Sequence, residues 1–167
     1  MRARSRLAAL TAALALVLAC SPSAPKAEPD PAFPFDLELL RGGRVRLSDL
    51  KGRLVLVDFW ATWCPPCVME IPELNAFYEE YGSRVELVAV AIDGEDRAEL
   101  AAWAEENGIG YPVAIGSEEL ARKYGAHAFP YHLLISPDGH VLERLDPGYH
   151  TRDDFRALVD RHADPVT

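Results

Sequence analysis

Two cysteines that could perform thiol chemistry, Cys64 and Cys67, are separated by two prolines in the run Trp63-Cys64-Pro65-Pro66-Cys67. An apolar stretch precedes this run and a segment with helical spacing follows it, so the first cysteine falls at a helix N-terminus. Unpaired backbone N–H groups there stabilise a thiolate, the form that attacks disulfides. We therefore expect Cys64 to be the nucleophile and Cys67 to resolve the mixed disulfide that forms.

Two acidic residues stand close to this dithiol in the sequence. Asp58 lies in the apolar stretch, where an ionised carboxylate is costly, and such a group can take the proton from Cys67 when that thiol attacks. Glu70 follows Cys67 by about one helical turn and can reach the dithiol from the helix. The sequence leaves open which acid is the working base. It also leaves open a structural role for Asp58 and a solvated position for Glu70.

A pair of closely spaced cysteines can also be half of a metal site. Zinc would need two further soft ligands, and His127 and His132 do not have the spacing of a zinc finger. A histidine in a strand, such as His132, more often packs in the core than perturbs a thiolate. We predict no metal and no cofactor.

The N-terminus has the pattern of a signal peptide over residues 1–19, with three arginines before an apolar run. That run, Leu7 to Ala19, is shorter than the roughly 20 residues that a spanning helix needs. It ends at Val17-Leu18-Ala19-Cys20, which resembles a bacterial lipobox and implies that Cys20 is lipidated and begins the mature protein. A plain secretory peptide is the alternative. If Cys20 carries lipid, the two remaining cysteines indicate a redox pair in an exported domain rather than a disulfide framework.

Three segments follow from composition. Residues 1–19 are the expected lipoprotein signal peptide, residues 20–34 are a proline-rich tether, and residues 35–167 form one domain. The net charge of −9 becomes more negative without the N-terminal arginines. Such a charge argues against nucleic acid and anionic lipid surfaces as partners.

Periodicity predicts an α/β sandwich with a mixed sheet, because strands and helices first alternate and a hairpin with a closing helix comes last. The expected strands and hairpins are 35–39, 45–47, 54–60, 85–92, 111–115, 131–135 and 141–145, and the expected helices are 69–81, 96–107, 117–124 and one that begins at 151.

The segment from Val57 to Cys67 resembles the active-site segment of thioredoxins. Taken on through Glu70 and Pro72, it is similar to the TlpA-like branch that includes ResA and the CcmG (DsbE) proteins. The resemblance covers residues 35–162 and implies a thioredoxin fold with an N-terminal β-hairpin and an inserted helix-strand unit at residues 96–115. It also implies that Asp58 matches the buried aspartate of thioredoxins, and that Glu70 modulates cysteine acidity and client binding.

A second landmark of the resemblance is Phe129-Pro130. It implies that this bond is cis, that Pro130 faces the dithiol, and that the backbone of Phe129 pairs with an extended client. Trp63 would cover the approach side, with an ordinary core position as the alternative. Phe129, Tyr131 and His132 are larger than the residues expected beside this proline.

The resemblance implies a membrane-anchored thiol:disulfide oxidoreductase, facing the periplasm or cell exterior, that reduces protein disulfides. Electrons would come from a membrane dithiol donor, clients would include apocytochrome c, and the protein would be a monomer. A dithiol oxidase running in the opposite direction and a copper-binding metallochaperone are the alternatives. A peroxidase would need a Thr-x-x-Cys and arginine arrangement, which the sequence lacks.

Overall fold

A computed structural model describes residues 30–163, in which strands and helices alternate along most of the chain. The strands are β1 (Asp30–Pro31), β2 (Asp36–Leu39), β3 (Arg44–Arg46), β4 (Leu54–Trp60), β5 (Val85–Ala91), β6 (Val113–Ile115), β7 (Tyr131–Ile135) and β8 (His140–Arg144). The helices are the 3-10 turn η1 (Leu47–Leu50) and α1 (Pro65–Tyr81), α2 (Arg97–Glu106), α3 (Glu118–Lys123) and α4 (Arg152–His162).

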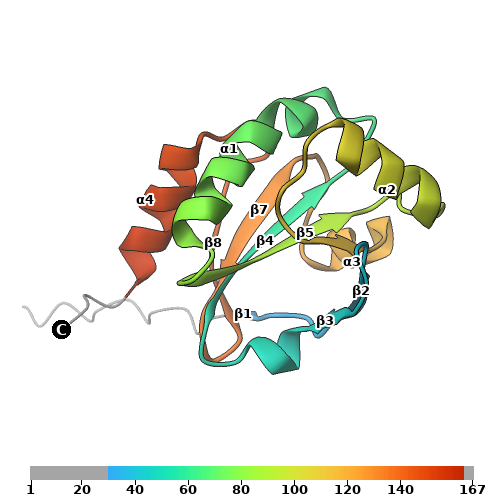
Figure 1. The fold of residues 1–167 in the computed structure, drawn as a ribbon. Helices are drawn as coiled ribbons and strands as arrows, with labels where there is room; N and C mark the ends of the chain where they lie inside the picture. The colour runs from blue at the N-terminus through green and yellow to red at the C-terminus, as the bar shows by residue number, and fades with distance from the viewer. Residues whose placement is uncertain (1–29, 164–167) are drawn as a thin grey trace, which may run out of the picture.

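The strands form one mixed sheet in the order β1-β8-β7-β4-β5-β6-β2-β3 (Figure 1). Strand β4 lies between β5, to which it is parallel, and β7, to which it is antiparallel. The register places Asp58 of β4 opposite Ala89 of β5 on one side and His132 of β7 on the other. The strand that leads to the dithiol is therefore held from both sides.

Helices cover both faces of this sheet. Helices α1 and α4 lie side by side (Figure 1), with the rings of Phe77 and Phe155 5.7 Å apart. On β4, Phe59 contacts Tyr124, at the end of α3, with a ring separation of 5.5 Å. Because side chains alternate along a strand, the neighbouring Asp58 points to the opposite face. Every residue of β4 is buried, which explains why this strand is almost continuously apolar.

The predicted mixed α/β architecture is confirmed, including the N-terminal hairpin β2–β3 and the inserted unit α2–β6. Serine and threonine are the N-caps of α3 and α4. Ser117 Oγ accepts the backbone N–H of Leu120, and Thr151 forms a capping box with Asp154.

The boundary of the tether is corrected. Asp30 and Pro31, assigned to the tether by composition, form β1 and pair with Val141 and His140 of β8. An edge strand tolerates proline because one of its sides makes no ladder hydrogen bonds, so proline content alone did not exclude a strand. The domain therefore extends at least to Asp30 rather than starting at Phe35. The expected signal peptide and residues 20–29 of the tether lie outside the described residues.

Candidate active site

The dithiol loop joins the end of β4 to the start of α1. Cys64 is the N-cap of α1, and Pro65 and Pro66 occupy its first positions, where a missing N–H costs no helical hydrogen bond. The helix thus begins at Pro65, not at Met69 as periodicity predicted. Cys64 and Cys67 are joined by a disulfide, with their Cα atoms 5.3 Å apart. The backbone N–H of Cys67 donates to Cys64 Sγ over 3.3 Å, so this sulfur lies at the helix N-terminus as predicted.

An aspartate after β5 holds the dithiol loop in place. Asp93 Oδ2 accepts hydrogen bonds from the backbone N–H of Thr62, at 2.9 Å, and from its hydroxyl, at 2.6 Å. Asp93 was not among the predicted site residues. The available signal was its position directly after a predicted buried strand, at the end of the sheet where the dithiol also lies.

An aromatic rim borders the disulfide. The Trp63 side chain is 61% exposed, so the alternative that placed it in the core is wrong. Its ring meets that of Phe129 edge to face, with centroids 6.2 Å apart. The bond between Phe129 and Pro130 is cis, as the resemblance implied, and Pro130 is buried. The rim thus consists of Trp63, which precedes Cys64 in the chain, and Phe129, which precedes the cis proline Pro130.

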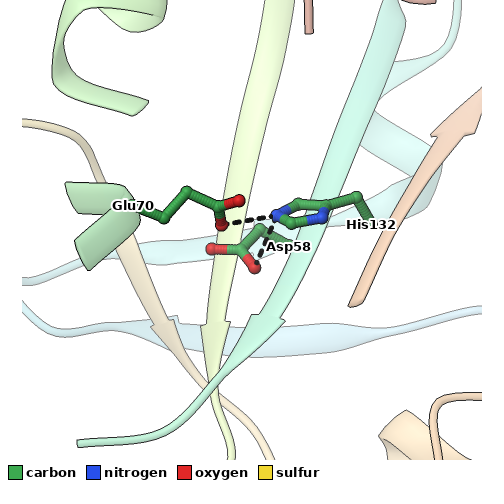
Figure 2. A group of neighbouring side chains, drawn as sticks. All are labelled: Asp58, Glu70 and His132. Carbon is green, nitrogen blue, oxygen red and sulfur yellow. Dashed lines mark ion pairs between the residues drawn. The ribbon is translucent and has the colours of Figure 1, made fainter. Parts of the chain in front are cut away.

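Three buried side chains form a cluster, which we call the buried triad: Asp58, Glu70 and His132. Figure 2 shows both carboxylates converging on the same nitrogen of His132. His132 Nε2 lies 2.9 Å from Glu70 Oε2 and 3.3 Å from Asp58 Oδ1. These are ion-pair distances rather than well-aligned hydrogen bonds, and within the described residues the ring Nδ1 has no hydrogen-bond partner.

The segment before α4 closes the triad from the side of the helices. The backbone N–H of His150 donates to Glu70 Oε1 over 2.6 Å. The ring of Phe155, on α4, lies edge-on to that of His132 at 4.9 Å. Since Asp58, Glu70 and His132 are each at most 1% exposed, their charges are shielded from water. Glu70 is therefore not the solvated acid that the sequence left as an alternative.

The environment of the triad shifts the proton affinity of its members. Burial lowers the pKa of His132, but the contacts with Asp58 and Glu70 outweigh it and raise that pKa to about 9. Burial raises the pKa of Glu70, against the opposing effects of His132 and the His150 N–H. Burial, with the charges of Asp58 and Glu70, also raises the pKa of Tyr111 well above its usual value. His132 and Glu70 therefore bind their protons more tightly than usual, while the neighbouring tyrosine stays neutral.

His132 lies buried in β7 and packs against Phe155, as its position in a strand predicted. Its contacts with both candidate bases are what the sequence did not indicate. The ligand-type atoms of the triad lie within 4.8 Å of one another, which is also close enough to hold a metal ion. The contact between His132 and Asp58 depends on the register of β4 and β7, which no local pattern in the sequence reveals.

The remaining predicted site residue, Cys20, lies outside the described residues. Among the helices that the structure does describe, none has the length and apolarity needed to cross a membrane.

Comparisons with known proteins agree with this geometry. The sequence model of the AhpC/TSA family matches residues 29–144. The chain is 37% identical over 108 residues to the thiol-disulfide oxidoreductase ResA of Bacillus thuringiensis (strain Al Hakam), covering 64% of this chain and 62% of that protein. It is 33% identical over 134 residues to ResA of Geobacillus kaustophilus (strain HTA426), covering 79% of this chain and 74% of the relative.

A solved structure shows the same architecture. The thiol:disulfide interchange protein of the thioredoxin family from Chlorobium tepidum TLS superposes with a TM-score of 0.70 at 29% identity, covering 81% of this chain and 97% of that one. The predicted thioredoxin fold is therefore confirmed.

Proposed function

This chain belongs to the AhpC/TSA family, and from that premise we propose that it is a thiol:disulfide oxidoreductase whose Cys64–Cys67 pair exchanges electrons with protein disulfides. The observation that carries the proposal is the disulfide at the N-terminus of α1, with the exposed Trp63 next to it in the chain and the buried Glu70 about one turn along the helix. The relatives named ResA support the same activity, although the first of them is matched over only 62% of its length.

The first step joins enzyme and client. In the reduced protein the Cys64 thiolate attacks one sulfur of a client disulfide, a Cys64–client disulfide forms, and the client's other sulfur leaves as a thiolate that takes a proton from water. The helix N-terminus stabilises the attacking thiolate through its free N–H groups, of which that of Cys67 already faces the Cys64 sulfur.

The second step releases the client. The Cys67 thiol gives its proton to an acid of the triad, and its sulfur attacks that of Cys64. The Cys64–Cys67 disulfide forms, and the client leaves as a thiolate that is then protonated. Two electrons pass to the client, which becomes a dithiol. Asp58 and Glu70 are the acceptors that burial suits to this transfer.

The client would be held at the rim. An extended client strand would pair with the backbone before Pro130, and Trp63 and Phe129 would pack on its side chains. The exposed fraction of Trp63, 61%, supports this, since a large apolar ring in water gains from being covered.

We further propose that the protein works outside the cytoplasm as a monomer, anchored by lipid on Cys20, and that it acts as a reductase. A membrane dithiol would supply the electrons, and proteins such as apocytochrome c would receive them. The resemblance of residues 17–20 to a lipobox supports the lipid anchor, and the relatives' name, thiol-disulfide oxidoreductase, supports the exchange activity.

Reduction of insulin disulfides by the full chain, with dithiothreitol as electron source, tests the activity. We expect Cys64→Ser and Cys67→Ser to abolish catalysis, and Cys20→Ser, which removes only the proposed lipid site, to retain it. Wild-type protein that gives no rate above dithiothreitol alone would refute the proposal.

Equilibration of the Cys64–Cys67 pair with glutathione tests the direction. A reductase should have a potential near the value of about −270 mV known for thioredoxin, and a potential near about −120 mV would identify an oxidant instead.

A further inference from the structure

The exchange chemistry proposed above uses the two cysteines and an acid, but it does not account for His132. This ring is completely buried, lies opposite Asp58 across the β4–β7 pair, and reaches Glu70 from the same nitrogen (Figure 2). A buried imidazole with no structural hydrogen bond of good geometry, placed between two candidate bases, calls for a role of its own.

Two carboxylates that contact the same atom create an electrostatic problem. In a site without water, two ionised carboxylates at this distance repel each other strongly, so one of them would hold a proton permanently. A proton on Nε2 of the ring between them, 2.9 Å and 3.3 Å from their oxygens, removes that repulsion. Both acids can then be ionised at the same time.

We propose that His132 is a positioning residue that holds a proton between Asp58 and Glu70 and thereby joins the two acids into one buried acceptor for the proton of Cys67. This inference rests on the proposed function. It also answers the question that the sequence left open, because the working base is the pair rather than either acid alone.

Among the described neighbours of the two acids, His132 is the group that can carry the positive charge between them. Within the described residues, the ion pairs of Asp58 and Glu70 are all with His132. The strand β5 places Ala89 opposite Asp58. Tyr111, on the segment before β6, is a neutral neighbour of the acids.

The helices and the segment before α4 complete the surroundings. Helix α4 contributes the apolar ring of Phe155, and α1 carries Glu70 about one turn after Cys67. His150 presents its backbone N–H to Glu70, and its ring lies 5.3 Å from that of His132. Tyr149 is exposed and donates its hydroxyl to Glu73.

The proton count is consistent with the oxidised structure. Before the second step, the triad holds one proton, on His132, and its net charge is −1. When Cys67 gives up its proton and its sulfur closes the disulfide, one carboxyl becomes neutral, and an imidazolium–carboxylate pair remains. The triad is then neutral overall, which suits a fully buried site in the disulfide form. Reduction by an external dithiol reverses the transfer and returns the proton to Cys67.

A titration of the His132 ring by ¹⁵N NMR tests the proposal in the intact wild-type chain with its dithiol reduced, the state in which both acids are ionised, and with EDTA present so that no divalent cation replaces the proton. We expect a charged ring at pH 7. Glu70→Gln and Asp58→Asn should each weaken proton binding to His132 by about tenfold or more, since each removes a carboxylate that favours the charged ring. A neutral ring at pH 7 in the wild type, or a titration that neither variant moves, would overturn the proposal.

Glu73→Gln is the matched control. Glu73 lies about one turn further along α1 and accepts the backbone N–H of Arg152 at 2.8 Å, much as Glu70 accepts that of His150. It belongs to no ion pair with His132, so the variant should leave the His132 titration unchanged.

The rate at which glutathione leaves a preformed Cys64–glutathione disulfide tests whether the acids act as one acceptor. Asp58→Asn and Glu70→Gln should each slow release at least tenfold, and the double variant should be no more than about twofold slower than the slower single variant. A double variant whose release rate is reduced by the product of the two single reductions would contradict a shared acceptor. Because the ring titration needs no activity, a wild-type chain inactive on insulin would refute the proposed function and leave the ring titration as a separate test of the proton on His132.

Discussion

Histidine and carboxylate side chains meet inside this fold and also at its surface. The buried triad combines Asp58 and Glu70 with His132. At the surface, which we call the outer cluster, Glu143 of β8 contacts His162 at 2.8 Å and Arg161 at 2.6 Å, both on α4. The residue types and distances are similar, but only the first cluster is closed to water.

The pKa values of Glu70 and Glu143 are shifted in opposite directions. Burial raises the pKa of Glu70, whereas the hydrogen bond from Arg161 lowers the pKa of Glu143 despite its partial burial. Distance alone therefore does not define a functional cluster. Exclusion of water turns an ion pair into a site that stores a proton, while the same contact in water stabilises only weakly.

The largest expected difference between the clusters is in the cost of losing the histidine. His132→Gln leaves two buried acids without their cation and should lower the free energy of unfolding by about 3 kcal/mol or more. His162→Gln should change it by less than about 1 kcal/mol, because the outer cluster is solvated and retains Arg161. Urea unfolding of the oxidised chain at pH 7 measures the free energy of unfolding of both variants. Equal losses in the two variants would show that burial does not distinguish the two clusters.

The pH dependence of stability should come next in size. The pKa of His132 is raised from 6.5 to about 9 in the fold, so its contribution is fully present below pH 6.5 and is lost as the pH rises through about 9. The loss should amount to about 3 kcal/mol, since each tenfold change in proton affinity corresponds to about 1.4 kcal/mol. Unfolding of the oxidised chain at pH 6 and pH 10 measures it. A His132→Gln variant with the same pH dependence as the wild type would contradict this origin.

The contribution of the outer cluster to stability should change with pH in the opposite direction and by a smaller amount. Because the pKa of Glu143 is lowered in the fold, its contribution is present above its usual range and is lost as the pH falls through the lowered value. Glu143→Gln should therefore cost less than about 1 kcal/mol at pH 7, and still less in 1 M NaCl, where salt screens exposed pairs. A larger loss of stability, or a loss that salt leaves unchanged, would show that water and salt do not weaken the ion pairs of this cluster.

Much of the site was predictable because its signals are local. A run of apolar residues, two prolines between cysteines and a helical period placed Cys64 at a helix start, and the structure confirms that position. The beginning of α1 at Pro65 was missed because the first turn of a helix faces the loop and carries no apolar period.

The triad was not predictable in the same way. Asp58 and His132 become neighbours only through the antiparallel pairing of β4 and β7, which are far apart in the chain. A one-residue change of register would turn His132 to the other face of the sheet and leave no trace in periodicity. Strand β1 was missed for a related reason, since its pairing with β8 joins distant segments and overrides a proline-rich composition.

Trapping of a mixed disulfide tests whether Cys64 is the attacking thiol. The full chain with Cys67→Ser is reduced, freed of reductant and incubated with insulin whose disulfides are intact. The products are separated without reductant and identified by mass spectrometry. We predict a covalent adduct through Cys64 with Cys67→Ser, and no adduct with Cys64→Ser, in which the nucleophile is absent. An adduct that forms equally through either cysteine, or that forms with neither variant, would contradict the assignment of Cys64 as the attacking thiol.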